Sequence, residues 1–240
     1  MNTAFVLFDL DDTLYPAGAG LMKEISARIT CYVAEHLRIS LDAADALRRE
    51  YYLRYGSAVH ALVVQHHLDL ADFLAFAHDV DVEHYLAPDA DLDCLLGCIH
   101  APKAIFTNAP HAYAERVLRA LGIEQHFARV FDYEFGDYLG KPDAAVYRRV
   151  QAALEVPSER LVMVDDAAKN LMPARALGWK TIWVTPIRDD FNPRVDFIVQ
   201  DLWQIADAFH QLGVMDSAHR VMAEHRLVGC PWARTLLSVR

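Results

Sequence analysis

Three aspartates lie within four positions near the start of the sequence. Asp9, Asp11 and Asp12 directly follow the apolar segment Phe5–Phe8, which is typical of a strand buried on both faces. Carboxylates this close raise one another's proton affinity, and a bound cation or a catalytic task is the usual relief. Asp9 and Asp11 point to the same side of an extended chain, so one can attack while the other handles a proton. The segment alone leaves a solvated acidic turn as the alternative.

A hydroxyl, an amide and a lysine follow at positions suited to phosphate binding. Thr107 and Asn108 come at the end of the predicted strand Lys103–Thr107, where a hydroxyl and the free N–H groups of a following helix can hold an anion. We expect Asn108 to cap that helix, and Thr107 taken alone can equally be a capping residue. Lys141 lies in a turn between a glycine and a proline, although an isolated lysine is more often a solvated charge.

A second acidic pair, Asp165 and Asp166, follows the apolar segment Leu161–Val164. A second pair after a second apolar strand is difficult to explain as a surface turn. Oxygen ligands of this kind suit Mg²⁺, which keeps several waters and is often completed by a substrate phosphate. The sequence therefore indicates a magnesium site and a phosphorylated substrate.

The elements that must position these residues alternate between strand and helix from residue 91 onward. Such alternation predicts a parallel sheet with helices on both faces, and ligands of these sheets bind at the carboxyl ends of the strands. The predicted strands after Phe5–Phe8 are Lys103–Thr107, Val130–Phe131, Leu161–Val164, Lys180–Val184 and Phe197–Val199. The predicted helices are Asp91–Ile99, His111–Leu121, Asp143–Leu154, Ala167–Leu177 and Asp201–Leu212.

Between the first strand and residue 91 the pattern is only helical. Leu21, Ile25, Ile29 and Val33 recur at four-residue steps, and Ser40 can cap a following helix. We therefore divide the chain into an α/β core of residues 1–14 and 91–214, a helical insert of residues 15–90, and an appendage of residues 215–240. The appendage either packs on the core or mediates a contact.

Composition limits the class of protein. Apolar residues make up 54% of the 240 residues, yet no apolar run reaches the ~18 residues that a membrane helix needs. The net charge of −10 argues against binding a nucleic acid polymer. The four cysteines show no disulfide or zinc pattern, and no basic start precedes the first apolar run. We expect a cytoplasmic monomer or homodimer that acts on a small phosphorylated metabolite.

The order of these motifs resembles the haloacid dehalogenase superfamily. Its four motifs match here as Asp9–Thr13, Thr107, Lys141 and Asp165–Asp166, within a similarity that spans about Thr3 to Val199. The resemblance implies a doubly wound parallel sheet whose inserted helices form an all-helical type 1 cap. It also implies phosphoester hydrolysis, because dehalogenating members lack an acid at the position of Asp11.

The resemblance further assigns roles to the residues. Asp9 would be the nucleophile that forms an aspartyl-phosphate, and Asp11 would protonate the leaving group and later activate water. Thr107, Asn108 and Lys141 would hold the phosphate, with Lys141 also neutralising Asp9. Mg²⁺ would be bound by Asp9, the backbone carbonyl of Asp11 and the acidic pair Asp165–Asp166, with Asp166 favoured as the direct ligand and Asp165 orienting a ligand water or Lys141.

A narrower resemblance is to the pyrimidine 5′-nucleotidase group, in the segments Phe8–Pro16, Ile105–Ala109 and Val164–Leu171. It implies hydrolysis of nucleoside monophosphates such as UMP and CMP. Residues of the insert would select the substrate, and the candidates are Tyr15, Tyr51, Tyr52, Tyr55 and Arg54. The alternatives are a broad sugar-phosphate or phosphoglycolate phosphatase with the same site and, outside the enzymes, a phospho-receiver switch.

Overall fold

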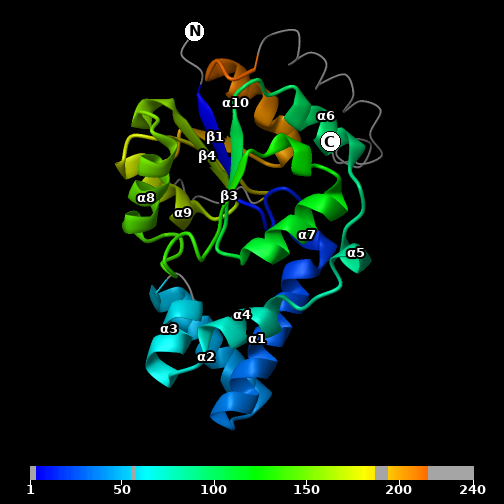
Figure 1. Ribbon diagram of the computed structural model, residues 1–240, viewed down its shortest axis with the longest axis vertical. Helices are drawn as coiled ribbons and strands as arrows, with labels where there is room; N and C mark the ends of the chain where they lie inside the picture. The colour runs from blue at the N-terminus through cyan, green and yellow to red at the C-terminus, as the bar shows by residue number, and fades with distance from the viewer. Residues whose placement is uncertain (1–3, 56–57, 187–193, 216–240) are drawn as a thin grey trace.

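The computed structural model describes residues 4–55, 58–186 and 194–215. Six strands form one parallel sheet in the order β3-β2-β1-β4-β5-β6 (Figure 1). The strands are β1 (Phe5–Phe8), β2 (Lys103–Phe106), β3 (Arg129–Phe131), β4 (Leu161–Asp165), β5 (Lys180–Val184) and β6 (Phe197–Val199). The doubly wound α/β fold predicted from the sequence is confirmed, and each predicted strand is present.

The first strand lies at the centre of the sheet because its side chains are apolar on both faces. Phe8 pairs with Ile105 of β2 and with Val164 of β4, so the three strands end level with one another. The backbone N–H of Asp9 continues the ladder by donating to the Val164 carbonyl at 2.8 Å. The residues that follow these strands therefore meet at one edge of the sheet, which is where the sequence places its polar groups.

Helices cover both faces of the sheet (Figure 1). On one face, α8 (Ala144–Leu154) and α9 (Ala168–Ala176) pack over a hydrophobic cluster that contains Leu7 of β1. On the other face, Val6 and Phe8 pack in a second cluster that is completed by three helices. These helices are α6 (Ala90–Gly97), α7 (His111–Leu121) and α10 (Ile205–Gln211). Alternate side chains of β1 therefore pack in two separate hydrophobic cores, one on each face of the sheet.

Four helices of the insert pack together beyond the carboxyl edge of the sheet (Figure 1). These helices, called here the helical cap, are α1 (Leu21–Leu37), α2 (Leu41–Tyr55), α3 (Ala58–His66) and α4 (Leu70–His78). They share a hydrophobic cluster built around Tyr32, Val33 and Phe73. Leu21 and Ile25, at the start of α1, pack instead with the sheet, as does Val82 of α5 (Val82–Tyr85). The division at residues 14, 90 and 214 stays a prediction.

Apart from shifts of one or two residues at the ends of elements, the structure differs from the predictions in two places. The helix α7 begins after Pro110 with no side-chain cap, so the prediction that Asn108 caps it is wrong. The last predicted helix divides into a 3₁₀ turn and α10. The 3₁₀ turns are Ala17–Ala19, Glu124–His126, Ser158–Arg160 and Leu202–Gln204. The expected appendage, residues 215–240, lies outside the described residues except for Met215.

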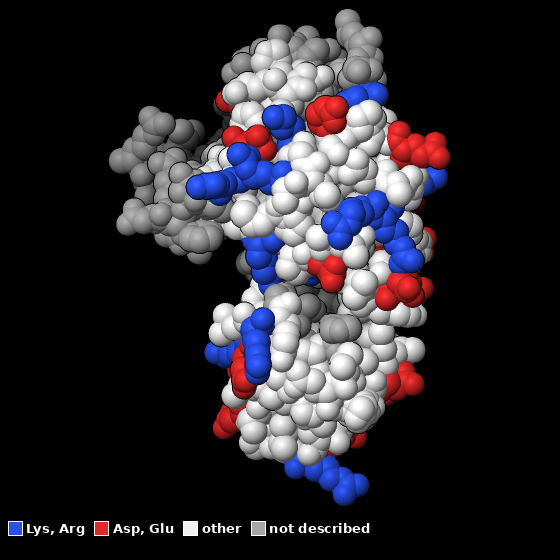
Figure 2. All heavy atoms as spheres, turned by 90° about the vertical axis from the view of Figure 1, so that its left-hand side faces the viewer, with Lys and Arg blue, Asp and Glu red and all other residues white. Residues whose placement is uncertain are grey.

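Charged side chains gather over the α/β part of the face in Figure 2, while the cap surface there is largely uncharged. Leu53 and Val64 of the cap are 83% and 55% exposed. Within the described ranges, no helix has both the length and the apolar character needed to cross a membrane.

Candidate active site

A buried lysine joins two buried carboxylates at the carboxyl edge of the sheet. The Lys141 ammonium lies 2.7 Å from Asp9 Oδ1 and 2.7 Å from Asp165 Oδ2. The three residues are 1%, 7% and 0% exposed, so this is an ion cluster removed from water. The sequence separates Asp9 and Lys141 by 132 positions, and the parallel sheet brings them into contact. Buried charges of this kind persist when they are paired and hydrogen-bonded.

Asp165 has its carboxylate fully engaged by the protein. Besides Lys141, it accepts from the backbone N–H of Ala167 at 2.8 Å and from the Asn170 amide at 2.9 Å. These donors come from the turn that leads into α9, so the acidic pair and its helix hold each other in place. Asp165 is therefore well placed to fix the Lys141 ammonium, and Asp166 has the freer carboxylate.

Asp166 faces Asp9 across a threonine. The Thr13 hydroxyl accepts from the Asp166 backbone N–H at 3.0 Å, and its oxygen lies 3.4 Å from Asp9 Oδ2 and 3.5 Å from Asp166 Oδ1. Trp183 of β5 donates to the Asp166 carbonyl at 2.7 Å and fixes this turn from the other side. Thr13 belongs to the first motif, but the sequence gives no sign that it joins the two acidic pairs.

The donor set fits a hard divalent cation. One carboxylate oxygen from each of Asp9, Asp165 and Asp166 lies within 4.8 Å of the others. Oxygen ligands in such a cluster are those that Mg²⁺ takes from proteins. Since Asp165 is engaged by three donors, Asp9 and Asp166 are the better candidates for direct ligands.

Burial gives the acidic cluster unusual proton affinity. It raises the pKa of Asp9 to about 7, with the Lys141 ammonium opposing the rise and Asp166 adding to it. Burial and the neighbouring Asp165 raise the pKa of Asp166 to about 7. Burial raises the pKa of Asp165 to about 6 against the pull of Lys141. A cation placed among these groups would favour their ionised forms.

Asn108 holds the backbone of Lys141 rather than a helix end. Its amide donates to the Lys141 carbonyl at 2.9 Å and its oxygen accepts from the Lys141 N–H at 2.7 Å. Gly140 permits this approach, because a Cβ there would lie 2.7 Å from the Asn108 oxygen and 2.8 Å from the Tyr133 ring. The direct contact with phosphate that the sequence suggests for Asn108 stays a prediction.

Thr107 is buried at the end of β2, on the same edge as Asp9. Its hydroxyl oxygen accepts from the backbone N–H of Ala109 at 3.0 Å and so keeps its own proton to donate. The Thr107 hydroxyl therefore stabilises the local turn and can still donate to a phosphate. Both alternatives from the sequence, capping and phosphate binding, remain open.

Asp11 is held by two phenols. Tyr15 and Tyr113 donate to the same oxygen, Oδ1, at 2.6 and 2.8 Å. Burial raises the pKa of Asp11, and the two hydrogen bonds oppose the rise. Tyr15 was a candidate for substrate contact, and the structure gives its hydroxyl to Asp11 instead. Tyr113 lies in the first turn of α7 and escaped the sequence analysis, since only its distance from Asp11 in space reveals it.

The cap faces the site through the last turn of α2. The Lys169 ammonium, from α9, lies 3.3 Å from the centre of the Tyr52 ring, which spans the junction of cap and core. Tyr51 is buried within the cap, where its hydroxyl bonds Gln65. Tyr55 lines a pocket instead, and is the one of the candidate tyrosines found there.

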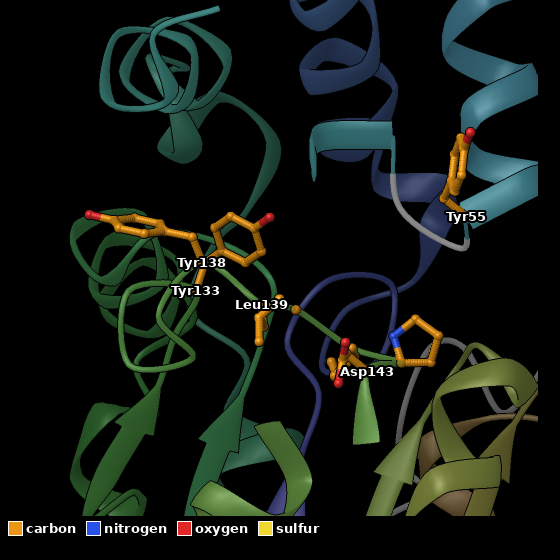
Figure 3. Close-up of a pocket in the computed structure, with 8 residues that line it drawn as sticks. Tyr55, Tyr133, Tyr138, Leu139 and Asp143 are labelled. Carbon is orange, nitrogen blue, oxygen red and sulfur yellow. The ribbon is translucent and has the colours of Figure 1, made fainter. Parts of the chain in front are cut away.

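That pocket has a volume of about 310 Å³ and adjoins Lys141. Figure 3 shows Tyr55 on the cap side of the pocket, and Tyr133 with Tyr138 on the loop that precedes Lys141. Its lining residues are Tyr55, Tyr133, Tyr138, Leu139, Gly140, Lys141, Pro142 and Asp143. Aromatic and aliphatic surface dominates this list, so the pocket suits a flat, largely apolar group.

A family model of haloacid dehalogenase-like hydrolases matches residues 4–178, which include all four motifs. The chain belongs to this family. The family assignment supports hydrolase activity, and the sheet order differs from the order 2-1-3-4-5 of phospho-receivers. The receiver alternative therefore has no support in the fold.

One relative is Phosphate metabolism protein 8 of Saccharomyces cerevisiae, with 25% identity over 189 residues. The alignment covers 71% of this chain and 58% of the yeast protein, so the chain spans little more than half of that relative. This relative does not distinguish a nucleotidase from other phosphatases of the family.

Solved structures share the fold at low identity. A HAD phosphatase from Thermococcus onnurineus has a TM-score of 0.61 at 19% identity, covering 86% of this chain and 97% of that one. A putative HAD hydrolase from Bacillus subtilis, bound to magnesium, has a TM-score of 0.56 at 17% identity, covering 89% and 100%. A 2-haloacid dehalogenase from Pseudomonas syringae has a TM-score of 0.55 at 20% identity, covering 87% and 99%. Phosphatases and dehalogenases share this fold, so the reaction must be argued from the site.

Proposed function

We propose that the protein is a magnesium-dependent phosphomonoester hydrolase that forms an aspartyl-phosphate on Asp9. The observation that carries the proposal is the buried cluster in which Lys141 bridges Asp9 and Asp165. Lys141 favours the ionised form of Asp9, which a nucleophile requires. Asp11 supports phosphoryl transfer over dehalogenation, because breaking a phosphoester needs an acid for the leaving alkoxide.

The reaction would run in two balanced steps. An Asp9 oxygen bonds to phosphorus while the bond to the leaving oxygen breaks, and Asp11 gives that oxygen its proton. A water oxygen then bonds to phosphorus as the bond to Asp9 breaks, and Asp11 takes the water's proton. Inorganic phosphate and the free alcohol leave, and both aspartates return to their starting states.

Mg²⁺ would be held by Asp9, Asp166 and the backbone carbonyl of Asp11, with Asp165 positioning Lys141. When bound, the cation supplies positive charge that neutralises phosphate oxygens and orients them. Thr107 and Lys141 would donate to the remaining phosphate oxygens, and the backbone N–H groups at Asn108 would complete the anion seat.

For the substrate we propose nucleoside monophosphates, as in the pyrimidine 5′-nucleotidase group. The pocket of about 310 Å³ beside Lys141 supports this choice, because three tyrosines line it and a planar base can stack on them. Its volume is at the lower end of the ~300–1,000 Å³ range of small-molecule sites. We further expect the protein to act in the cytoplasm, as a monomer or homodimer, on small metabolites and not on nucleic acid polymers.

The test is phosphate release from UMP, CMP, AMP, phosphoglycolate and ribose 5-phosphate, with Mg²⁺ and with EDTA. We expect release that requires Mg²⁺, favours UMP and CMP, and falls by on the order of 10⁴-fold in Asp9→Asn. A preference for phosphoglycolate or ribose 5-phosphate would keep the mechanism and discard the nucleotidase. Full turnover by Asp9→Asn would remove the assigned nucleophile.

A further inference from the structure

Asp11 has its two carboxylate oxygens in different surroundings. Oδ1 accepts both phenol hydrogen bonds, from Tyr15 at 2.6 Å and from Tyr113 at 2.8 Å. Both tyrosines are buried, at 4% and 1% exposure, so the two donors are fixed by packing. Among the described residues, Oδ2 receives no hydrogen bond. The two tyrosines, called here the clamp, therefore fix Oδ1 and leave Oδ2 available for proton transfer.

The two phenol oxygens lie beside each other. Their oxygens are 3.4 Å apart, and the two rings approach Asp11 from separate elements, the turn after β1 and the first turn of α7. A carboxyl group anchored through one oxygen loses the rotation about its Cβ–Cγ bond. Two donors on Oδ1 also disfavour a proton there, so a proton on Asp11 resides on Oδ2.

Tyr113 is in turn tied to the chain that returns from the cap. The His78 ring, at the end of α4, meets the Tyr113 ring edge-on with centroids 4.9 Å apart. Arg116, one turn along α7, donates to the backbone carbonyls of His78 and Val80, at 2.5 and 2.9 Å. The segment that leaves the cap is thus fastened to the helix that carries Tyr113.

We propose that Tyr15 and Tyr113 are positioning residues that hold Asp11 through Oδ1 and present Oδ2 to the leaving oxygen, and that Arg116 couples this clamp to the return segment of the cap. The inference rests on the proposed phosphomonoester hydrolysis and adds the residues that set the geometry of its proton transfer.

The test compares two substrates that differ in their need for an acid. UMP releases an alkoxide that needs a proton from Asp11, whereas p-nitrophenyl phosphate releases a stable phenolate that does not. Both substrates need Asp11 to activate water in the second step, so release of the alcohol or phenolate is followed within a single turnover, before that step. In Tyr113→Phe and Tyr15→Phe we expect the single-turnover rate of uridine release from UMP to fall at least tenfold, with the rate of p-nitrophenolate release within twofold of that of the parent protein. Arg116→Gln should shift the ratio of the two rates in the same direction by a few-fold.

Tyr32→Phe is the matched control. Tyr32 is 2% exposed, and its hydroxyl donates to a carboxylate, Asp72, at 2.7 Å, but within the cap. This variant should leave the UMP to p-nitrophenyl phosphate ratio unchanged. Circular dichroism melts of all four variants identify any loss of fold.

The outcomes separate the two proposals. If the parent protein hydrolyses neither substrate, the proposed function fails and this inference fails with it. If the parent is active and the tyrosine variants lose both activities equally, or lose neither, the positioning role is wrong while the hydrolase stands. If Arg116→Gln keeps the parent ratio while Tyr15→Phe and Tyr113→Phe shift it, the coupling to the cap is wrong and the clamp stands.

Discussion

Two buried lysines occupy opposite ends of the same sheet and have opposite surroundings. Lys103 opens β2 at 7% exposure and donates to the backbone carbonyls of Ile99 and Ala101, at 2.7 and 3.3 Å. Lys141 reaches the carboxyl ends of the strands at 1% exposure and donates to two carboxylates. Burial lowers the pKa of Lys103. Burial acts in the same direction on Lys141, but Asp165 and Asp9 raise its pKa above the ordinary value.

The difference separates a structural lysine from a chemical one. Neutral carbonyls accept two hydrogen bonds from Lys103 without binding its charge strongly, so this residue closes the turn before β2. At the other end, three carboxylates have oxygens within 4.8 Å of one another, and the Lys141 ammonium contacts two of them. Such a concentration of charge is costly for folding, and the proposed polyanionic substrate with its cation would explain why it is kept.

Replacing the two lysines in turn should give the largest difference in stability and activity. Lys141→Met leaves Asp9 and Asp165 buried without their shared cation, so we expect a loss of about 3–5 kcal/mol in the free energy of unfolding. Hydrolysis should fall by about 10²–10³-fold or more, because a phosphate-binding charge is lost as well. Urea unfolding and phosphate-release assays at pH 8 measure the two effects.

Lys103→Met is the matched variant at the other end of the sheet. It removes two hydrogen bonds to carbonyls together with a poorly solvated charge, so we expect a cost of about 1 kcal/mol and full activity. If the two variants lose stability equally, the distinction drawn between the lysines is wrong.

The sequence predicts which residues meet at this edge of the sheet better than it predicts the contacts that support them. Asp9, Thr107, Lys141 and Asp166 are found because each stands after a predicted strand or in a turn, and parallel strands bring their ends together. The six strands are predictable because their apolar segments are continuous.

The supporting contacts are not predictable in this way. The clamp of Tyr113 on Asp11 joins residues 102 positions apart, and a tyrosine in a helix is usually core packing. Asn108 looks like a helix cap by type and position, yet the approach of Gly140 turns its side chain toward Lys141. Such roles depend on which loops meet in space, and local spacing does not carry that information.

Breaking the support of Lys141 without removing its charge should have a smaller effect. Asn108→Ala removes both hydrogen bonds to the Lys141 backbone, so we expect a cost of about 1–3 kcal/mol and a roughly tenfold loss of kcat/KM. Asn108→Asp is the comparison variant, because its oxygen can still accept from the Lys141 N–H. It should retain more activity than Asn108→Ala, and equal loss in both would mean that the Lys141 backbone needs no such support.

Magnesium should stabilise the protein in a pH-dependent manner. Asp9, Asp165 and Asp166 have folded-state pKa values raised from 3.8 to about 7, 6 and 7. The metal-free folded state therefore binds more protons than the unfolded state across this range, and its stability falls as pH rises from about 4 to 7. Mg²⁺ needs the ionised carboxylates, so its effect should be larger at pH 8 than at pH 5.

At ten times its dissociation constant, Mg²⁺ should add about 1.4 kcal/mol at pH 8, which is a few degrees in Tm. Asp166→Asn should abolish this increase, whereas Asp143→Asn, at the N-terminus of α8, should retain it. An equal effect of Mg²⁺ at both pH values would place the cation elsewhere.

The smallest expected effect is the change in stability that Lys103 causes at alkaline pH. Its direction is opposite to that of the buried carboxylates. The folded-state pKa of Lys103 lies below the ordinary value of 10.5, so between these two values the unfolded chain binds more protons than the folded one. Lys103 therefore makes stability rise with pH in the window just below 10.5, with a slope under the ~1.4 kcal/mol per pH unit of a single proton. Lys141, whose pKa is raised, loses its stabilising effect only as pH climbs beyond 10.5.

Urea unfolding of the parent protein and Lys103→Met, in steps from pH 8 to 10.5, isolates the effect of Lys103 as the difference in stability between the two proteins. A difference that grows with pH would confirm that Lys103 is held by neutral partners alone, and one that shrinks would show that a carboxylate pairs with it after all.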